Sequence, residues 1–392
     1  MLVGVVGKAN VGKSTFFRAS TLAPAQIGPH PFVTIEPNKA IAYVKTECPC
    51  KKLKIKCNPN NSPCIEGNRF VPFEILDVAG LIPGAHLGKG LGNKFLDDLR
   101  RADCLIHVLD TAGSTDEKGN QITPGNRDPS EDLLFLKEEF DFWLQKILIK
   151  HFKDKKQKFN LNDLVDVLSG LKIKKEHISK TLKISNLKIS DISNWDKEKF
   201  LKFAIGLRNE SKPIVICANK CDLKIARENL KKLKKKYPED IFIPVSAESE
   251  LVLREASNKN FIKYIPGEDN FSILKEISKK QEKALEFINK KILKVLSDTG
   301  VQQCINKAVL DVLKYIVVYP VEDEKKFVDK KGRILPDAFL IPKDSSALDL
   351  AYKIHSEIGE KFIGAIDCKT KRRIGKETNL KDGDIIKILT SN

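Results

Sequence analysis

The sequence lacks any apolar run of about 18 residues, the minimum that a membrane-spanning helix requires. The first apolar segment begins at residue 2, which leaves no room for a signal peptide. Methionine occurs once and tryptophan twice among 392 residues, and Asp and Glu total 52 against 69 Lys and Arg. The missing apolar run and the missing room for a signal peptide argue against a membrane or secreted protein. They predict a cytoplasmic protein without a membrane partner, long enough for about two or three domains.

The shortage of acidic residues leaves a formal net charge of +17, with Lys-rich stretches at residues 150–158, 172–175 and 224–236. A strongly basic chain favours an anionic partner, and we expect RNA or the ribosome. The alternative is that these lysines form solvated helix faces, a pattern also typical of proteins from organisms that grow at high temperature. The nine cysteines are an odd number, which argues against a disulfide framework.

The most informative segment is GKANVGKS at residues 7–14, which lies between the apolar run Leu2–Val6 and a possible helix. This context is typical of a phosphate-binding loop, whose backbone N–H groups surround the phosphates of a nucleotide. We expect Lys13 to reach the β- and γ-phosphates and the Ser14 hydroxyl to bind Mg²⁺. The alternative is a plain glycine-rich turn. The predicted nucleotide-binding residues are Gly7, Lys8, Ala9, Asn10, Val11, Gly12, Lys13, Ser14 and Thr15.

A second acidic segment, DVAG at residues 77–80, follows the mixed apolar segment Arg69–Leu76. A carboxylate at the end of a strand can hold Mg²⁺ through a bound water, so Asp77 is a predicted metal-site residue. Gly80 would let a backbone N–H approach the γ-phosphate. The alternative, an ordinary turn after a strand, is disfavoured because a phosphate loop precedes it.

The choice of base depends on the segment NKCD at residues 219–222, which follows the apolar run Ile214–Ala218. The Asp222 carboxylate can accept hydrogen bonds from guanine N1–H and N2–H₂, which adenine does not offer, so a mismatch leaves buried groups unpaired. Asn219 can bond N7 and the Lys220 stem can cover the base. The backbone N–H groups of Ser246 and Ala247, after Ile241–Val245, can reach guanine O6. The alternative is a polar turn.

The chain resembles the YchF subfamily of Obg-related GTPases, in an archaeal-type branch. The residues that carry the resemblance are NVGKST at 10–15, PFVTIEPN at 31–38 and DVAGLIPGAHLGKGLGNKF at 77–95. The resemblance covers nearly the whole chain. It implies an α/β fold, a P-loop GTPase domain with a mostly parallel sheet and helices on both faces, interrupted by a helical insertion. It also implies a C-terminal β-grasp (TGS) domain.

The resemblance adds three expectations about the site. Thr34 matches a switch threonine that binds Mg²⁺ in the triphosphate state. Leu81 stands where Ras-like proteins carry a water-positioning glutamine, and a leucine cannot orient water. Asn10 matches an asparagine that helps related GTPases bind an activating K⁺, which would supply positive charge beside the phosphates. Some YchF relatives have lost the Asn-Lys-X-Asp pattern and use ATP, whereas this chain retains it.

Four cysteines form a separate cluster, in a loop rich in Asn, Pro and Lys. Four thiolates can close a tetrahedral structural Zn²⁺ site, and the flanking lysines favour thiolates. The Cys-X-Cys pair is, however, tighter than the usual zinc spacing, so a β-hairpin excursion without metal is an equal alternative. The candidate ligands are Cys48, Cys50, Cys57 and Cys64.

The periodicity along the chain predicts its domain organisation. The gap between the strand at Leu105–Asp110 and the next near Pro213 far exceeds the roughly 30 residues of one βαβ unit. Helical patterns occur at 131–152, 161–171, 197–207, 271–296 and 301–315, and strand patterns at 316–319, 338–341, 362–367 and 384–389 around one helix at 346–358. We predict a GTPase domain at 1–128 and 205–283, a helical insertion at 129–204, a helical connector at 284–315 and the TGS domain at 316–392.

The sequence thus predicts a slow Mg²⁺-dependent GTPase that binds GTP and GDP and acts as a switch in translation or on the ribosome. The catalytic candidates are Lys13, Thr34 and Gly80, and the Mg²⁺ candidates are Ser14, Thr34 and Asp77. The basic segment KTKRR at 369–373 is a candidate contact to RNA phosphates. Two alternatives remain open: an ATPase of the same family, and an RNA- or ribosome-binding adaptor in which hydrolysis is incidental.

Overall fold

The computed structural model describes residues 1–22, 38–78 and 98–391, and its centre is a seven-stranded sheet. The strand order is β2-β4-β1-β5-β6-β7, and the short β3 pairs with β4. β1, β4, β5, β6 and β7 run parallel, whereas β2 and β3 run antiparallel to β4. The strands are β1 (Leu2–Val6), β2 (Lys39–Glu47), β3 (Cys64–Ile65), β4 (Asn68–Asp77), β5 (Cys104–Asp110), β6 (Ile214–Asn219) and β7 (Ile241–Pro244).

The central strand β1 shows why helices cover both faces of this sheet. Its five residues are all buried, and successive side chains point to opposite faces. Val3 and Val5 pack in a core with α1 (Lys13–Thr21) and α12 (Val301–Asn306). Leu2 and Val6 pack in a second core with the helices inserted after β5. The expected mostly parallel sheet with helices on both faces is therefore confirmed.

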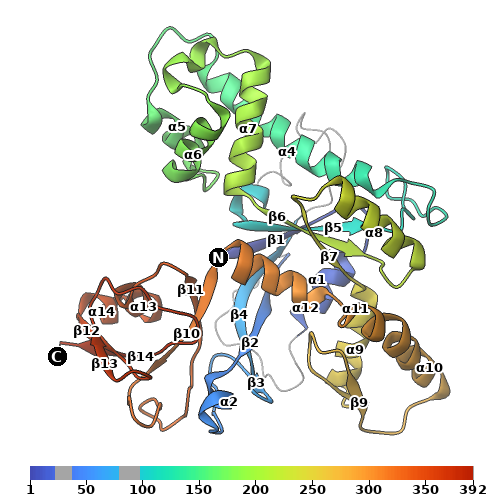
Figure 1. Ribbon diagram of the computed structural model, residues 1–392, viewed down its shortest axis with the longest axis vertical. Coiled ribbons are helices and arrows are strands. Elements are labelled where there is room, and N and C mark those ends of the chain that lie inside the picture. Colours follow the sequence, from blue (N-terminus) through green and yellow to red (C-terminus); the bar gives the residue numbers. More distant parts are fainter. Residues whose placement is uncertain (23–37, 79–97, 392) are drawn as a thin grey trace.

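The helical insertion lies at one end of the molecule, at the top of Figure 1. Its first helix buries an apolar stripe with a four-residue step, formed by Leu136, Phe140, Leu144, Leu148 and Phe152. Its elements are α4 (Pro129–Phe152), α5 (Leu161–Ser169), α6 (Lys175–Ser185), the 3₁₀ helix η2 (Ile189–Asn194) and α7 (Lys197–Ser211). The sequence patterns indicated α4, α5 and α7, but not α6. No helix in the described ranges is long and apolar enough to cross a membrane.

The segment after β7 corrects two helix predictions. β8 (Ile262–Tyr264) pairs with β9 (Phe271–Ile273), so the helix expected from residue 271 begins only at α10 (Lys279–Ile288), where Ser278 caps it. The chain continues through η3 (Asn289–Leu293) and α11 (Lys294–Leu296). The helix expected at 301–315 consists of α12 followed by the π-helix η4 (Lys307–Val312), and a strand already starts at Tyr315.

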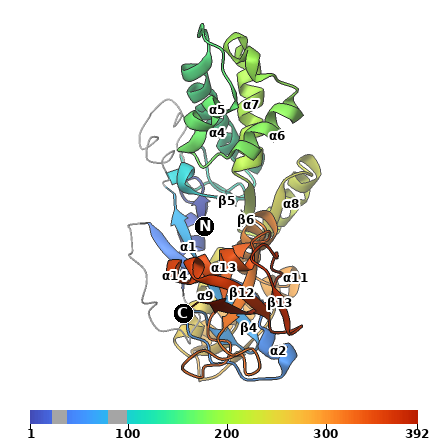
Figure 2. The ribbon, with the colours of Figure 1, turned by 90° about the vertical axis from the view of Figure 1, so that its left-hand side faces the viewer.

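The C-terminal part forms a five-stranded sheet in the order β11-β10-β14-β12-β13, which packs on short helices (Figure 2). The expected single helix at 346–358 is wrong: His355 adopts an extended conformation (φ −162°) and divides it in two. Ser346 is the N-cap of the first of these helices and forms a capping box with Asp349. The elements are β10 (Tyr315–Val321), β11 (Phe339–Pro342), α13 (Ala347–Ile354), α14 (Ser356–Glu360), β12 (Phe362–Asp367), β13 (Arg372–Ile374) and β14 (Ile385–Thr390).

Two of the domain boundaries proposed from the sequence fall inside helices. Position 204/205 lies within α7, and position 283/284 lies within α10. The start of the insertion, in contrast, coincides with the N-cap of α4, where the Asp128 side chain accepts a hydrogen bond from the Ser130 N–H. The division into four parts therefore stays a proposal, and a cut at either of the two helical positions would break a helix.

Candidate nucleotide site

The predicted motif segments meet at one edge of the central sheet. The phosphate loop follows β1, Asp77 ends β4, Asn219 ends β6, and Ser246 follows β7. These strands are parallel, so their carboxyl ends lie at the same edge. Ligands of open parallel sheets bind outside this edge, which makes it the candidate nucleotide site.

The glycines of the phosphate loop are required by close packing. Gly12 has a φ of 96° and is the N-cap of α1. A Cβ atom at Gly12 would lie 2.2 Å from Asn219 Nδ2, and one at Gly7 would lie 2.7 Å from the Val108 carbonyl oxygen. Lys13, Ser14 and Thr15 then form the first helical turn, whose free N–H groups and dipole favour an anion.

Lys13 and Asp77, the residues predicted to bind phosphate and metal, contact each other directly. Lys13 Nζ donates a hydrogen bond to Asp77 Oδ1, and both side chains are largely buried. The cation expected to hold phosphate thus lies beside the carboxylate expected to hold the Mg²⁺ hydration shell. Thr34, Gly80 and Leu81, which were also predicted to act here, lie outside the described residues.

Asn219 ties three of the motif segments together. Its side-chain Nδ2 donates to the Val11 carbonyl in the phosphate loop at 2.9 Å. Its Oδ1 accepts from the Ala247 backbone N–H at 3.1 Å. Ser246 Oγ donates to Asp222 Oδ1 at 3.2 Å, so the predicted base-reading residues form one connected group. Asn219 is only 4% exposed, which makes each of its hydrogen bonds costly to lose.

Lys220 has a buried partner that the sequence reasoning missed. Its Nζ lies 3.1 Å from Asp110 Oδ2 and 2.9 Å from Ser114 Oγ. Asp110, at the end of β5, is 1% exposed and also accepts bonds from the Ala112 and Ser114 N–H groups. These contacts fix the Lys220 stem, which was predicted to cover the base. The sequence signal that could have identified Asp110 was an acidic residue at the end of a strand, directly before a Ser/Thr-rich loop.

The phosphate loop also contacts the start of the helical insertion. Lys8 Nζ donates to Asp132 Oδ2 in α4 at 2.7 Å, and this ion pair is buried. Asn10 Nδ2 donates to the Gly119 carbonyl at 2.9 Å. Gly119 has a φ of 86° and packs against Ala9, where a Cβ atom would come within 2.7 Å. The segment after β5 therefore covers the outer side of the loop.

We expect Asn219→Ala to weaken GDP and GTP binding together and to lower the free energy of unfolding by about 2–4 kcal/mol, because two buried backbone groups lose their partner. Thermal unfolding and calorimetric titration measure the two effects. Asn229→Ala is the matched control, since Asn229 Nδ2 donates one bond to the Thr111 carbonyl at 3.0 Å. Equal effects of the two substitutions would contradict the role of Asn219 as a tie between segments.

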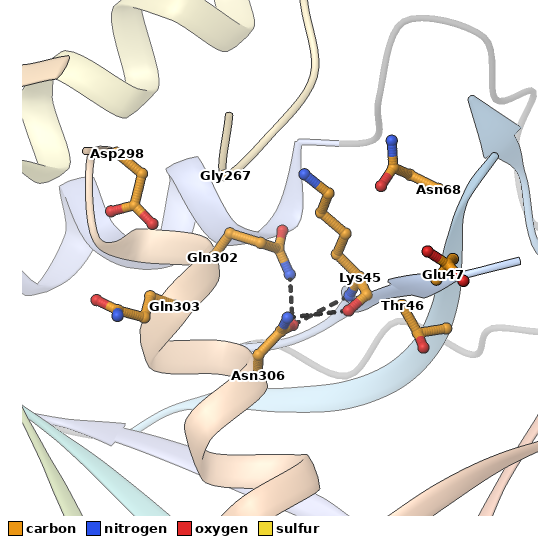
Figure 3. Close-up of a pocket in the computed structure, with 9 residues that line it drawn as sticks. All are labelled: Lys45, Thr46, Glu47, Asn68, Gly267, Asp298, Gln302, Gln303 and Asn306. Atoms are coloured by element: carbon orange, nitrogen blue, oxygen red, sulfur yellow. Dashed lines mark hydrogen bonds between the residues drawn. The ribbon is translucent and has the colours of Figure 1, made fainter. Parts of the chain in front are cut away.

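A further pocket, of about 310 Å³, is lined by none of the predicted site residues. Figure 3 shows that residues of β2 and α12 form much of it. Asn306 donates to the Lys45 carbonyl at 2.9 Å and accepts from the Lys45 N–H at 3.0 Å, while Gln302 donates to the Tyr43 carbonyl. β2 is an edge strand, so these amides satisfy backbone groups that would otherwise be unpaired. We interpret this pocket as structural.

The four candidate zinc ligands do come together. Their sulfur atoms all lie within 4.8 Å of one another, at the end of the central sheet where β2, β3 and β4 meet. This region contains the short helix α2 (Pro49–Leu53) rather than an irregular loop. The cluster lies on residues distinct from those of the nucleotide site.

A phosphate loop, a Lys–Asp pair and an Asn-Lys-X-Asp segment at one sheet edge define a nucleotide-binding protein of the P-loop GTPase class. Family profiles agree along the chain. A 50S ribosome-binding GTPase profile matches residues 2–138, an Obg-like GTPase YGR210-like, G4 motif-containing domain matches 217–323, and a TGS domain matches 327–390. The expected TGS domain is thereby confirmed.

Individual relatives extend over the whole chain. An uncharacterized GTP-binding protein of Methanocaldococcus jannaschii is 50% identical and covers 100% of this chain and 99% of its own length. The Bacillus subtilis protein named ribosome-binding ATPase YchF is 27% identical over 98% of each chain. The crystal structure of a GTP binding protein from Pyrococcus horikoshii has a TM-score of 0.76 and 37% identity over 100% of both chains. The chain belongs to the YchF-like family of Obg-related GTP-binding proteins.

Proposed function

We propose that this chain is a Mg²⁺-dependent GTPase that works as a slow switch. The connected group of Asn219, Asp222, Ser246 and Ala247 carries the proposal. The Asp222 carboxylate, which Ser246 Oγ contacts, provides acceptor oxygens for the guanine N1–H and N2–H₂ donors. Adenine offers neither donor at these positions, so it would leave a partly buried carboxylate unpaired.

The phosphate side of the site supports hydrolysis by positioning and charge. Lys13 provides the cation for the β- and γ-phosphates, and the N-terminal turn of α1 provides N–H donors. The Ser14 hydroxyl and the Asp77 carboxylate are oxygen donors of the type Mg²⁺ prefers, and Thr34 is the third proposed ligand. Mg²⁺ would neutralise charge that develops on the phosphate oxygens. Gly80 would offer its N–H to the γ-phosphate.

A leucine at position 81 removes the glutamine route to water activation, so we propose that a K⁺ ion near Asn10 supplies additional charge. Only the amide oxygen of Asn10 can bind K⁺, because its amide nitrogen is a donor, which here donates to the Gly119 carbonyl. Turnover of GTP measured with Mg²⁺ in KCl and again in NaCl tests both metal roles. Equal rates in the two salts would exclude a role for K⁺, and undiminished turnover after Mg²⁺ chelation would refute the Mg²⁺ dependence.

The competing proposal is that the chain uses ATP, because some relatives are named ATPases. Besides the Bacillus subtilis protein, Obg-like ATPase 1 of Homo sapiens is 30% identical over 72% of this chain. This chain nevertheless retains Asn219, Lys220 and Asp222 in a connected arrangement. Competition between unlabelled ATP and bound GTP separates the two possibilities, because a guanine-specific site releases GTP only at a large excess of ATP.

We further propose that the partner is the ribosome or another RNA. The Bacillus subtilis relative is named ribosome-binding, and the net charge of +17 suits a phosphate-rich surface. A basic group of the TGS domain lies at the hairpin of β12 and β13, where Lys371 and the first two residues of β13, Arg372 and Arg373, are exposed. A switch with such a partner would couple the nucleotide state to translation.

We expect the triple substitution Lys371→Ala, Arg372→Ala and Arg373→Ala to weaken ribosome or RNA binding by about 10-fold or more. It should also reduce the slope of log K against log salt concentration by the equivalent of about 2–3 phosphate contacts. Sedimentation with ribosomes at several salt concentrations measures this. The control removes three exposed charges from α8 (Lys224–Lys236) by replacing Lys231, Lys234 and Lys235 with alanine. Equal losses would indicate non-specific attraction by net charge.

A further inference from the structure

The cysteine cluster brings together the short helix α2 and the start of strand β3. Cys48 caps the start of α2 and Cys50 lies inside that helix, whereas Cys64 begins β3. Cys57 lies between them, and Cys50 Sγ is 3.8 Å from Cys64 Sγ. Cys48 is fully buried and Cys50 is 7% exposed. Four thiols thus converge in a region where the regular elements are only five and two residues long.

The spacing of the sulfur atoms suits one tetrahedral metal ion. With metal–sulfur bonds of about 2.3 Å, the edges of an S₄ tetrahedron are about 3.8 Å. The Cys50–Cys64 separation equals that edge, and all four sulfurs lie within 4.8 Å of one another. The group contains cysteines alone, and a closed set of four thiolates is the ligand set of structural Zn²⁺ sites.

Arg69 provides the charge that such a site needs around it. Four thiolates and one Zn²⁺ carry a net charge of −2, which is costly to bury without compensation. Arg69 is 0% exposed, and its Nη1 lies 3.9 Å from Cys57 Sγ. A buried cation that donates to a ligating sulfur is a typical outer-sphere contact of a metal site.

The loop that contains Cys57 also forms hydrogen bonds with the C-terminal domain. The Asn58 N–H donates to the Ile334 carbonyl at 2.8 Å, and the Asn60 N–H donates to the Pro336 carbonyl at 2.6 Å. Asn61 then exchanges two bonds with the Ala338 backbone, at 2.9 and 3.1 Å. Alternating backbone contacts of this kind resemble one edge of a β-ladder.

Arg69 completes this interface from the side of the central sheet. Its Nη2 donates to the Leu335 carbonyl at 2.6 Å, and its guanidinium lies 5.5 Å from the centre of the Tyr319 ring in β10. Cys48, Cys50, Tyr319 and Leu335 belong to one continuous buried core. The cysteine cluster and the C-terminal domain therefore pack in the same hydrophobic core.

We propose that Cys48, Cys50, Cys57 and Cys64 bind one structural Zn²⁺, and that this ion orders residues 57–64 so that they dock the TGS domain onto the GTPase sheet. Residues 54–63 belong to no helix or strand, and the free energy of metal binding would help to order them. The ion takes no part in nucleotide chemistry, so this proposal goes beyond the proposed GTPase function and is independent of it.

The first test is metal analysis of the purified full-length chain. We expect about one Zn²⁺ per chain, lost in Cys57→Ser and retained in Cys368→Ser, which changes a buried cysteine of the C-terminal domain outside the cluster. A chain with no metal, or with iron in place of zinc, overturns the assignment. Unchanged zinc content in Cys57→Ser overturns the ligand set.

The second test measures docking by amide hydrogen exchange. Removal of the metal by a thiol-reactive reagent and chelator should speed exchange about 10-fold or more at the amides of Asn58, Asn60 and Ala338, with GDP binding unchanged. Asn61→Ala should loosen the same amides while zinc stays bound, since Asn61 is no ligand. Exchange at these amides that does not respond to metal removal overturns the docking role.

Discussion

We expect Asp222→Ala to lower the affinity of this protein for GDP and GTP by about 100-fold or more and to leave its affinity for ADP unchanged. In its proposed role the carboxylate accepts hydrogen bonds from two guanine donors, and hydrogen bonds to charged groups contribute about 1.5–3 kcal/mol each. Loss of both bonds therefore corresponds to at least two orders of magnitude in the dissociation constant. Calorimetric titration of GDP, GTP and ADP into the original chain and the variant measures this.

The control for Asp222 is a carboxylate away from the base-reading segments. Asp240 serves this purpose because it pairs with Lys137 at 2.6 Å. Asp240→Ala should leave guanine affinity within about twofold, since it alters a local ion pair only. If the original chain binds ADP as well as GDP, and Asp222→Ala changes neither, then the chain uses adenine nucleotides and the proposed roles of Asn219, Asp222, Ser246 and Ala247 fail.

Lys13→Ala is expected to reduce GTP turnover by about 10²–10³-fold, the usual cost of removing one preorganised donor from the developing charge. It should also weaken GTP binding more than GDP binding, because the γ-phosphate loses its cation. Single-turnover hydrolysis and titration with both nucleotides distinguish the two effects. The substitution also separates Asp77 from its cationic partner, so the melting temperature is measured alongside.

Lys39→Ala is the control for Lys13, because Lys39 forms an ion pair with Glu74 on the neighbouring strands β2 and β4. Turnover equally reduced in both variants would indicate general destabilisation rather than a phosphate contact. The same Lys13 variant tests the adaptor alternative. Ribosome or RNA binding that survives intact without nucleotide would support an adaptor, whereas binding that depends on nucleotide supports a switch.

The motifs of the nucleotide site could be predicted because each lies within a few consecutive residues. The order GKANVGKS, DVAG and NKCD, with each segment after an apolar run, predicts parallel strands that end in polar loops. Helices with a clear apolar period, such as α4, were predicted for the same reason. Where one residue redirects the backbone, the patterns failed: His355 divides a helix whose apolar residues continue past it, and Ser278 starts a helix after a strand.

The contacts between segments that are distant in the sequence could not be predicted from the sequence patterns. Lys8 pairs with Asp132, Lys220 with Asp110, and Arg69 with the Leu335 carbonyl, in each case across more than a hundred residues of sequence. Asp110 had a local signal, its place at a strand end before a Ser/Thr-rich loop, whereas nothing local distinguishes Asp132, because its role depends on which helix end it reaches after folding. The four cysteines were visible as a cluster, but their position against the TGS domain was not.

The sequence by itself determined the class of the protein, since phosphate, metal and base are recognised by residue types at short fixed spacings. It also determined the alternation of Val3 and Val5 against Leu2 and Val6 that places helices on both faces of the sheet. Only the tertiary structure decided how the parts are coupled: which acid meets Lys8, and which domain the cysteine loop holds. These contacts depend on how whole helices and strands pack together, and the short-range periodicity of the sequence does not determine that packing.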